Sequence, residues 1–317
     1  MAGLVVLDAA AVARQLSIAE CIPLVRKAMI ALSDGTAKQL LRSFISMGEG
    51  RTFAQMPAAL GERSWFGAKL VSVFADPADP GHKAHKGVVI LFEGESGDPV
   101  CIADAGEVTR IRTAAATALA TDVLARKDAK VLTVMGAGLQ ARAHIEAVAL
   151  VRKLSEIRVW ARNAARAEEL AREMTSPALA VRAVTDAREA TTGADIVCTV
   201  TSSATPVLLG DWVQPGTHVN LVGSSAPTPV ETDTALVLKS RFIADHREHV
   251  LAHGAEFLRA KQAGLVNDTH VVAEIGEVLA GTKPGRQSSE EVTVYKSLGH
   301  AVQDLAAVSW LYERNKG

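Results

Sequence analysis

The sequence is short of cysteine and of net charge, and both shortages exclude classes of protein. Its three cysteines, Cys21, Cys101 and Cys198, are too few and too far apart for a disulfide framework or a cysteine-based metal site. Lysine and arginine number 34 against 35 acidic residues. This near balance argues against a nucleic-acid-binding face and against a polybasic membrane anchor.

Long hydrophobic runs are also missing. No apolar run approaches the ~20 residues that a membrane helix needs. The N-terminus lacks the basic and apolar segments of a signal peptide. We therefore expect a cytoplasmic protein with no nucleic-acid partner and no membrane partner.

The chain does have enough apolar residues for a packed core, at 48% of 317 residues, a length typical of two domains. A capping box of Ser17 and Glu20, followed by apolar residues at helical spacing, predicts a helix that stops at Asp34-Gly35. Short apolar segments between Gly, Pro and Asp turns then predict strands over 42–47, 52–56, 66–74, 87–92 and 100–103. This half is expected to be an antiparallel or mixed sheet behind one helix.

The pattern of predicted secondary structure changes after a predicted helix over 105–126. Short apolar strands now alternate with helical segments such as 164–174, and the predicted strands are 131–135, 157–160, 194–199, 218–223 and 241–244. Such alternation predicts a parallel sheet with helices on both faces. A last helix is expected over 290–313, capped by Ser288 or Ser289. The expected fold class is α/β, with a Rossmann domain over 115–299 and an α+β domain formed by 1–114 with 300–317.

A dinucleotide fingerprint stands at the start of the predicted Rossmann domain. The strand 131–135 leads directly into G-x-G-x-x-A, which reads Gly136-Ala137-Gly138-Leu139-Gln140-Ala141, and a helix follows. The first glycine permits the tight turn, the second leaves room for a pyrophosphate at the helix N-terminus, and the alanine allows close packing. The pattern predicts a nicotinamide dinucleotide as cofactor.

The end of the second Rossmann strand indicates which nicotinamide is preferred. NAD-specific sites carry an acid there, whereas this strand ends in Trp160-Ala161-Arg162-Asn163. Arg162 and Arg166 could hold a 2′-phosphate, so we predict NADPH, with NADH possible. Ligands bind at the carboxyl ends of such strands, and Thr199-Val200-Thr201 is therefore expected to face the cofactor.

Three cations of the first half lie in apolar or small-residue surroundings: Arg42, Lys69 and Arg112. Each such charge either reaches water along an apolar surface or holds an anion. Spacing alone favours the former.

Several motifs occur together in a fixed order. They are Met56-Pro57, Lys69, Arg112-Thr113-Ala114-Ala115, the glycine fingerprint, Gly285-Arg286, the run 290–299, and Asp304. This combination resembles the ornithine cyclodeaminase/μ-crystallin family over essentially the whole chain, and it is much more specific than a lone glycine loop.

The resemblance implies a homodimer whose first domain, completed by the C-terminal helix, forms the interface and supplies substrate groups. It also implies that Arg42, Lys69 and Arg112 bind a substrate carboxylate, with Met56 beside them. Besides the glycine fingerprint and Thr199-Val200-Thr201, the expected cofactor contacts are Arg112, Thr113, Arg162, Asn163, Arg166, Val222, Ser225 and Leu298.

One departure from the family pattern narrows the expected reaction. Cyclodeaminases and alanine dehydrogenases of this family carry an Asp after the fourth Rossmann strand, where this chain has Ser225 in Val222-Gly223-Ser224-Ser225-Ala226-Pro227. A hydroxyl cannot act as an ionised base at neutral pH, but reduction of a ready-made imine does not need one. The prediction is NAD(P)H-dependent reduction of Δ1-pyrroline-2-carboxylate to L-proline and of Δ1-piperideine-2-carboxylate to L-pipecolate. The proton donor is either Lys69 or a water held by Ser225.

Two other functions stay open. One is an ornithine cyclodeaminase or alanine-type amino-acid dehydrogenase, and the only argument against it is that Ser225 replaces the family's Asp. The other is an NADPH-bound binding protein of the μ-crystallin type, which the near-complete set of site residues disfavours.

One cluster and one single acidic residue remain as candidates for a role of their own. Asp245, His249 and His253 have a helical spacing that could bind zinc, but the charged neighbours favour a solvated surface and we expect no metal. Asp304 is expected to be structural or an interdomain hydrogen-bond partner.

Overall fold

The computed structural model describes residues 3–49, 51–76, 79–177 and 179–316. The chain forms two compact units, which are Met1–Ala115 with His300–Gly317 (unit 1) and Ala116–Gly299 (unit 2). The helix α3 (Ala105–Leu124) runs from one unit into the other. Among the described helices, none combines the length and apolar content needed to cross a membrane.

Unit 1 is built on a seven-stranded sheet with the order β1-β7-β6-β5-β4-β2, and β3 also pairs with β4. Its strands are β1 (Val5–Leu7), β2 (Lys38–Gln39), β3 (Ser43–Ser46), β4 (Thr52–Ala59), β5 (Phe66–Asp76), β6 (Asp79–Phe92) and β7 (Pro99–Asp104). The pairing is antiparallel except between β1 and β7. The predicted mixed sheet is therefore confirmed.

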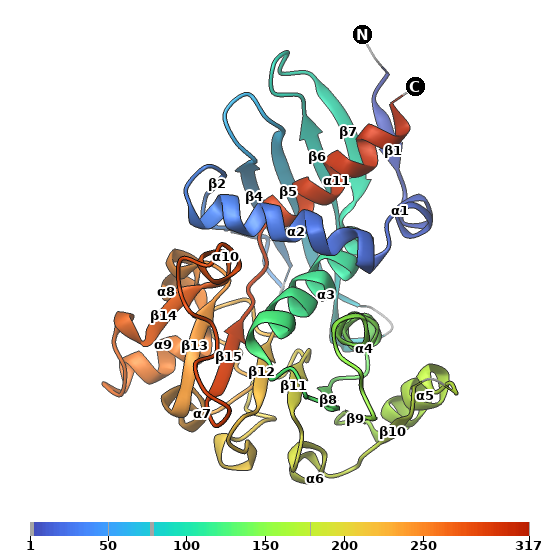
Figure 1. The fold of residues 1–317 in the computed structure, drawn as a ribbon. Helices are drawn as coiled ribbons and strands as arrows, with labels where there is room; N and C mark the ends of the chain where they lie inside the picture. The colour runs from blue at the N-terminus through green and yellow to red at the C-terminus, as the bar shows by residue number, and fades with distance from the viewer. Residues whose placement is uncertain (1–2, 50, 77–78, 178, 317) are drawn as a thin grey trace. The chain divides into compact units, whose positions relative to one another are not determined.

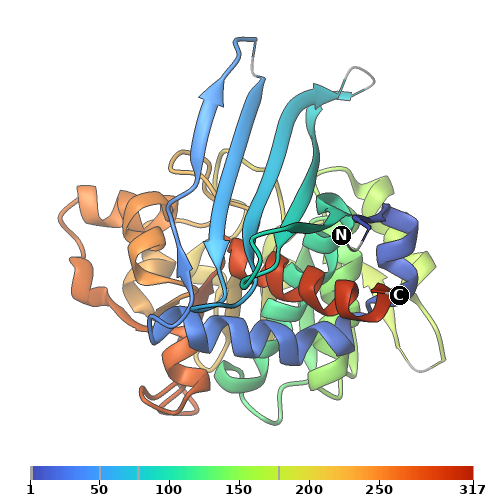
Figure 2. The same cartoon turned by 90° about the horizontal axis from the view of Figure 1, so that it is seen from above.

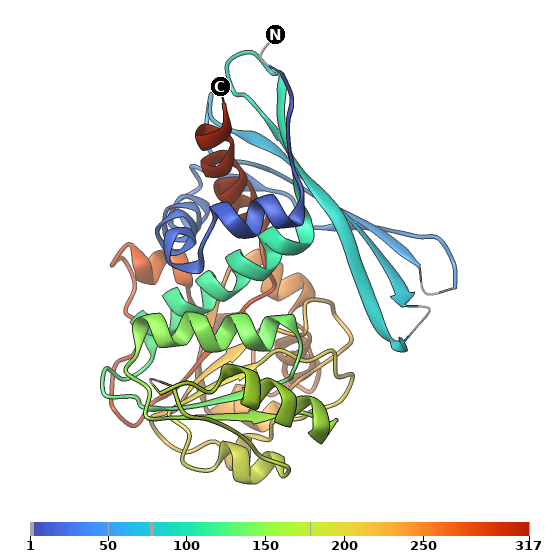
Figure 3. The same cartoon turned by 90° about the vertical axis from the view of Figure 1, so that its right-hand side faces the viewer.

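Three helices accompany this sheet, namely α1 (Ala9–Gln15), α2 (Ile18–Ser33) and α11 (Ala301–Asn315). Helix α11 packs on α2 and on strands β4 to β7, so the end of the chain completes the core of unit 1. Figures 2 and 3 show α2 and α11 on the same side of the sheet. The capping box at Ser17 and Glu20 forms as predicted, with the Ser17 amide 3.0 Å from Glu20 Oε2.

Unit 2 is an eight-stranded, wholly parallel sheet with the order β10-β9-β8-β11-β12-β15-β13-β14, which Figure 1 shows in this sequence across the picture. Its strands are β8 (Val131–Met135), β9 (Glu156–Trp160), β10 (Val181–Ala183), β11 (Ile196–Thr199), β12 (His218–Leu221), β13 (Ser240–Ala244), β14 (Val271–Glu274) and β15 (Val292–Lys296). The strand order reverses between β8 and β11. The Rossmann architecture is confirmed, and its ligands are expected where that reversal opens a crevice at the carboxyl ends.

The helices of unit 2 connect these strands. They are α4 (Leu139–Val151), α5 (Ala164–Met174), α6 (Ala187–Thr191), α7 (Thr234–Lys239), α8 (Arg247–His253), α9 (Ala255–Gln262) and α10 (Ile275–Leu279), with short 3-10 turns at Gly210–Trp212 and Asp268–His270. The predicted helix over 164–174 is confirmed to the residue.

The predicted last helix over 290–313 is wrong in its first part. Residues Val292–Lys296 form the buried central strand β15, and the helix begins only at Ala301 with His300 as its cap. The β-branched side chains of this segment suit a strand covered on both faces. Gly299, with φ of +79°, separates strand from helix. Neither Ser288 nor Ser289 therefore caps a helix.

Candidate functional site

The turn that follows β8 has the geometry of a dinucleotide-binding loop. Gly136 has φ of +132°, and a Cβ there would lie 2.9 Å from Val200 Cγ2 and from the Val200 carbonyl oxygen. Its amide donates to the Trp160 carbonyl at 2.7 Å, which ties the loop to the end of β9. Ala137 packs against the core behind it. Only glycine fits the first fingerprint position, because a side chain would collide with the end of β11.

The second fingerprint glycine leaves an open approach to helix α4. Gly138 is the N-cap residue, its side-chain position has nothing within 4 Å, and α4 receives no side-chain cap. The N-cap residue thus offers no side-chain acceptor to the first turn of α4, and the positive end of the helix dipole favours an anion there. Leu139 is 74% exposed. These features fit a dinucleotide pyrophosphate.

The segment after β9 is cationic and exposed. Arg162 and Arg166 both have exposed side chains, and no acid occurs between Trp160 and Arg166. Asn163 Oδ1 accepts the Arg166 amide at 3.3 Å and caps α5. The predicted cofactor contact by Asn163 therefore competes with a helix cap.

A carboxylate missed by the sequence analysis organises the carboxyl ends of β11 and β12. Glu231 is fully buried and accepts hydrogen bonds from Thr199 Oγ1 at 2.7 Å, from the Thr201 amide at 2.7 Å, from Thr201 Oγ1 at 2.8 Å and from the Gly223 amide at 2.7 Å. Burial raises its pKa, although Lys296 acts in the opposite direction. Two of the predicted cofactor residues, Thr199 and Thr201, are thus bound to one side chain.

A second buried charge holds the turn that contains Ser225. Lys296 Nζ lies 2.8 Å from Glu256 Oε2 and donates to the Ser224 carbonyl at 2.6 Å. Ser225 itself is half-buried, directly after this anchored residue, while Val222 is buried and its amide donates to the Thr199 carbonyl. The predicted residues of β11 and β12 therefore come together at one edge of the sheet.

Asp245 does not share a helix with the histidines that were weighed as metal ligands, because α8 begins only at Arg247. Its buried Oδ2 accepts the amides of Leu298 and Gly299 at 2.5 and 2.9 Å. It thereby fixes Leu298, one of the predicted cofactor residues. Over the described ranges, no group of three or more His, Cys, Asp or Glu side chains could hold a metal ion.

In unit 1, two of the predicted cations meet at a buried carboxylate. Lys69 Nζ lies 3.3 Å from Asp304 Oδ1, and Arg112 Nε donates to the same oxygen at 3.1 Å. Lys69 also donates to Thr109 Oγ1, and Arg112 Nη1 donates to Gln303 Oε1 at 3.0 Å. All of these contacts lie within unit 1, so Asp304 is not an interdomain partner. The position of Asp304 within a largely apolar helix, α11, is the sequence signal that indicates a buried ion pair here.

The other predicted residues of unit 1 lie around this pair. Met56 is buried and is the cross-strand partner of Lys69 in the β4–β5 register. Arg42 is half-buried between β2 and β3, and its charge acts on Lys69. Thr113 follows Arg112 on α3, and its buried Oγ1 has no hydrogen-bond partner among the residues that the structure describes. The structure thus gathers Arg42, Met56, Lys69 and Arg112.

The electrostatics of this cluster suit an anion and a proton transfer. Burial lowers the pKa of Lys69 from 10.5 to about 8, Asp304 raises it, and Arg112 and Arg42 lower it. Three cations and one carboxylate leave a net charge of +2. A buried excess of positive charge is stabilised by binding a carboxylate, and a lysine with this pKa can exchange a proton near neutral pH.

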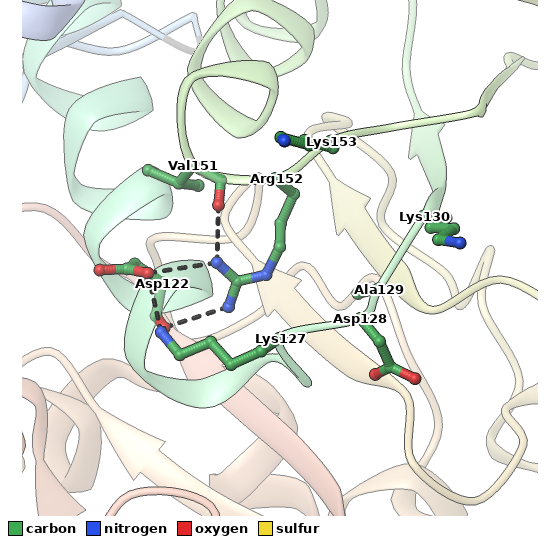
Figure 4. A pocket seen from close by; sticks show the side chains of 8 residues that line it. All are labelled: Asp122, Lys127, Asp128, Ala129, Lys130, Val151, Arg152 and Lys153. Carbon is green, nitrogen blue, oxygen red and sulfur yellow. Dashed lines mark hydrogen bonds and ion pairs between the residues drawn. The ribbon is translucent and has the colours of Figure 1, made fainter.

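A cavity of about 390 Å³ lies elsewhere in unit 2, near the amino end of β8 (Figure 4). Part of its charged lining is internally paired, since Lys127 Nζ and Arg152 Nη1 lie 3.0 and 3.2 Å from Asp122 Oδ1. Arg152 also donates to carbonyls at the end of α3. Ligands of this fold bind at the carboxyl ends of the strands, so we assign this cavity no part in the candidate site.

Comparison with known proteins gives a consistent set of relatives. The model of the ornithine cyclodeaminase/mu-crystallin family matches residues 4–317. The ketimine reductase mu-crystallin of Mus musculus is 34% identical over 281 residues, which is 88% of this chain and 86% of the relative.

Two solved structures are similar over nearly the whole chain. The Thermococcus litoralis Δ1-pyrroline-2-carboxylate reductase, in complex with NADH and L-proline, has a TM-score of 0.92 and 32% identity, covering 98% of this chain and 97% of that one. An archaeal alanine dehydrogenase dimer with bound NAD has a TM-score of 0.91 and 31% identity, with 98% and 95% covered.

Proposed function

The chain belongs to the ornithine cyclodeaminase/mu-crystallin family, and from this premise we propose that it is an NAD(P)H-dependent reductase of cyclic imino acids. The proposed reactions convert Δ1-pyrroline-2-carboxylate to L-proline and Δ1-piperideine-2-carboxylate to L-pipecolate. The observation that carries the proposal is the cluster of Arg42, Lys69 and Arg112 around Asp304, which has a net positive charge and a readily exchanged proton. Similarity to a ketimine reductase and to a reductase that binds L-proline supports it.

The carboxylate of the substrate is assigned to the three cations. An arginine can hold both oxygens of a carboxylate, and a neighbouring ammonium adds a point charge. Asp304 cancels one of the three positive charges, so binding one substrate carboxylate lowers the net charge of the cluster from +2 to +1. Met56, buried opposite Lys69, offers an apolar contact for the ring.

Reduction needs a hydride at the imine carbon and a proton at the imine nitrogen. The chemistry that the nicotinamide supplies when bound is the hydride. Lys69 supplies the proton, because its pKa of about 8 leaves the ammonium mostly protonated at neutral pH yet ready to release its proton. A water held by Ser225 is the second candidate donor. Holding the carboxylate also orients the C=N bond, and such positioning is worth up to about 7–11 kcal/mol.

The neutral Ser225 favours imine reduction over amino-acid oxidation or cyclodeamination. Those reactions need a base for the substrate's ammonium group, which a hydroxyl cannot provide. Two buried carboxylates of unit 2, Glu231 and Glu256, are already bound to the ends of β11 and β12 and to Lys296. Neither carboxylate is therefore available as the base for the substrate's ammonium group.

NADPH is the proposed cofactor, with NADH as a weaker alternative. The exposed Arg162 and Arg166 and the absence of an acid between residues 160 and 166 support a site for the 2′-phosphate. The open N-terminus of α4 at Gly138 supports the pyrophosphate. Further proposed contacts are Arg112, Thr113, Gly136, Ala137, Leu139, Gln140, Asn163, Thr199, Val200, Thr201, Val222, Ser225 and Leu298.

A homodimer formed through unit 1 is also proposed. Because Lys69 faces α11, the alternate residues of β5 lie on the other face of the sheet, where the cross-strand register adds neighbours from β3, β4 and β6. This outer sheet face carries Ile45, Phe53, Phe66, Leu70, Phe74 and Val88, and four of these are exposed apolar residues. Such a patch is typical of a protein interface.

One assay separates the candidate functions. The purified protein is mixed with NADPH and either cyclic imino acid, and the loss of NADPH absorbance is recorded. Parallel reactions with ornithine, scored for ammonia release, and with alanine and NAD⁺ test for a cyclodeaminase or a dehydrogenase. Oxidation of NADPH by the imino acids alone supports the proposal. Activity only with ornithine or alanine, or tight NADPH binding without turnover, contradicts it.

A further inference from the structure

The buried carboxylate of Asp304 has an arrangement that a purely structural role does not explain. Its side chain is fully buried on α11, and its Oδ1 receives both Lys69 Nζ and Arg112 Nε. Its Oδ2 is buried and has no hydrogen-bond partner within the described part of the chain. A buried ionised oxygen without a donor is costly, so retaining a carboxylate here calls for a reason beyond packing.

The carboxylate of Asp304 counteracts the positive charges that surround Lys69. Arg112 and Thr109 reach it from α3, Arg42 from the segment after β2, and Met56 adjoins it from β4. Both arginines disfavour a charged lysine, whereas Thr109 is a neutral partner. From α2, the Cys21 thiol adds no compensating charge, because burial raises its pKa to about 12. Asp304 is thus the group that favours the charged form of the lysine.

We propose that Asp304 is a positioning residue for the reduction, which holds the Lys69 ammonium in place and keeps it protonated between two arginines. The inference rests on the proposed function, in which Lys69 delivers the proton. Asp304 itself touches neither substrate nor cofactor, since its carboxylate is fully enclosed. It acts through Lys69 and Arg112.

Replacing the carboxylate by an amide should separate binding from turnover. Asp304→Asn removes the negative charge, so the cluster keeps a charge of +2 even when Lys69 is neutral. The substrate carboxylate is therefore held at least as well and KM does not rise. Lys69 loses its counter-ion and releases its proton at lower pH, so kcat falls. Loss of packing alone would instead raise KM and leave the pH dependence unchanged.

The matched control is Gln303→Leu on the same helix. It removes the other side-chain acceptor of Arg112 without changing the charge of the cluster. We expect it to raise KM through poorer placement of Arg112 while the pH profile of kcat stays in place. Asp304→Glu, which restores the charge, should return the pH profile toward that of the native protein.

The kinetic test measures kcat and KM for Δ1-pyrroline-2-carboxylate with NADPH across the pH range. For Asp304→Asn the pH at which kcat is half-maximal should move down by at least about one unit, and kcat above neutral pH should fall about tenfold. A pH profile of kcat that does not move in Asp304→Asn overturns the proposal, whether or not KM rises.

An NMR titration tests Asp304 without any substrate. Lysine-labelled protein is titrated in its native form, and the Lys69 signal is assigned with Lys69→Arg. We expect Lys69 to titrate near pH 8 in the native protein and at least about one unit lower in Asp304→Asn. If the variant does not fold, a native Lys69 that is already deprotonated at neutral pH overturns the inference. A supportive titration in a protein that ignores cyclic imines leaves Asp304's effect intact and rejects the proposed function.

Discussion

Gly223 and Thr201 touch backbone to backbone at the carboxyl edge of the Rossmann sheet. A Cβ on Gly223 would overlap the Thr201 carbonyl oxygen and would also lie 2.5 Å from Glu231 Oε1. The turns after β11 and β12 are therefore fitted to each other and to one buried carboxylate. This contact joins two groups of predicted cofactor residues that are far apart in the sequence.

Gly223→Ala should consequently impair cofactor binding. The added methyl group must push the two turns apart, because the neighbouring atoms are backbone and a buried carboxylate. We expect the NADPH dissociation constant to rise at least about tenfold, as even a small displacement of positioned groups is expensive. Fluorescence titration measures this constant. Gly3→Ala is the control, since its side-chain position has nothing within 4 Å, and equal affinities for the two variants would refute the prediction.

Lys69→Met should abolish most of the turnover. The change removes the proposed proton donor and one of three cations, and general acid catalysis alone is typically worth about 10²–10⁴-fold. In the native protein, kcat should decline as the pH rises through about 8, because the protonated form of Lys69 is then lost. Lys27→Met, an exposed lysine on α2, is the matched control. Native-like turnover by Lys69→Met would exclude it as proton donor and anchor.

Arg162→Ala should weaken NADPH binding without affecting NADH. A lost hydrogen bond to a charged group is worth about 1.5–3 kcal/mol, so KM for NADPH should rise about tenfold to a hundredfold. Steady-state kinetics with each cofactor give the ratio. Arg172→Ala, in the last turn of the helix α5 that follows Arg162, serves as the control. A parallel loss with both cofactors would argue against a 2′-phosphate contact.

Two buried histidines should make the protein sensitive to mild acid. Burial lowers the pKa of His144 to about 4 and that of His218 to about 3, from the ordinary 6.5. Between each lowered pKa and 6.5, the histidine is protonated in the unfolded chain but not in the folded one. The free energy of unfolding should therefore fall below about pH 6.5, by up to about 1.4 kcal/mol per pH unit for each histidine.

Urea unfolding at several pH values between about 7 and 5 measures this loss. His144 bonds to Thr117 Oγ1 at 3.0 Å, and His218 bonds to Asn220 Oδ1 at 3.2 Å and Thr293 Oγ1 at 2.9 Å, so asparagine or glutamine preserves part of each network. Such variants should be less stable at neutral pH but should lose less stability on acidification. An acid dependence that survives both replacements would assign it to other groups.

Ile45→Lys combined with Phe66→Lys should dissociate the proposed dimer. Both side chains are exposed on the outer sheet face, at 59% and 37%. Lysines there would bring like charges together in a desolvated interface. Sedimentation measures the association state. Leu238→Lys, on an exposed residue of α7, should leave the dimer intact, and a dimer that tolerates both Ile45→Lys and Phe66→Lys would exclude this face.

Features written in consecutive residues could be predicted from the sequence. The glycine fingerprint places Gly136 and Gly138 between a strand and a helix, and local steric demands alone determine that turn. The capping box at Ser17 and Glu20 is likewise local. The strand Val292–Lys296 is not predicted from the sequence, because its pairing partners β12 and β13 lie far away along the chain.

Contacts between distant residues escaped the sequence analysis. Lys69 and Asp304 are 235 positions apart, and only the packing of α11 on the first sheet brings them together. Glu231 collects donors from β11 and β12, an arrangement that no single segment reveals. For Asp304 the available clue is a charge within the apolar run 301–308, which predicts a partner but does not identify it, whereas Glu231 lies in a polar run without such a clue.

The insertion of unit 2 within the chain of unit 1 has a consequence for biosynthesis. Helix α11 is translated after the whole of unit 2, and it supplies both part of the core of unit 1 and the carboxylate beside Lys69 and Arg112. During translation of unit 2, the first segment of unit 1 therefore lacks α11, and Lys69 and Arg112 lack the carboxylate of Asp304. Domains generally fold as they emerge, so unit 2 can fold before the two segments of unit 1 come together.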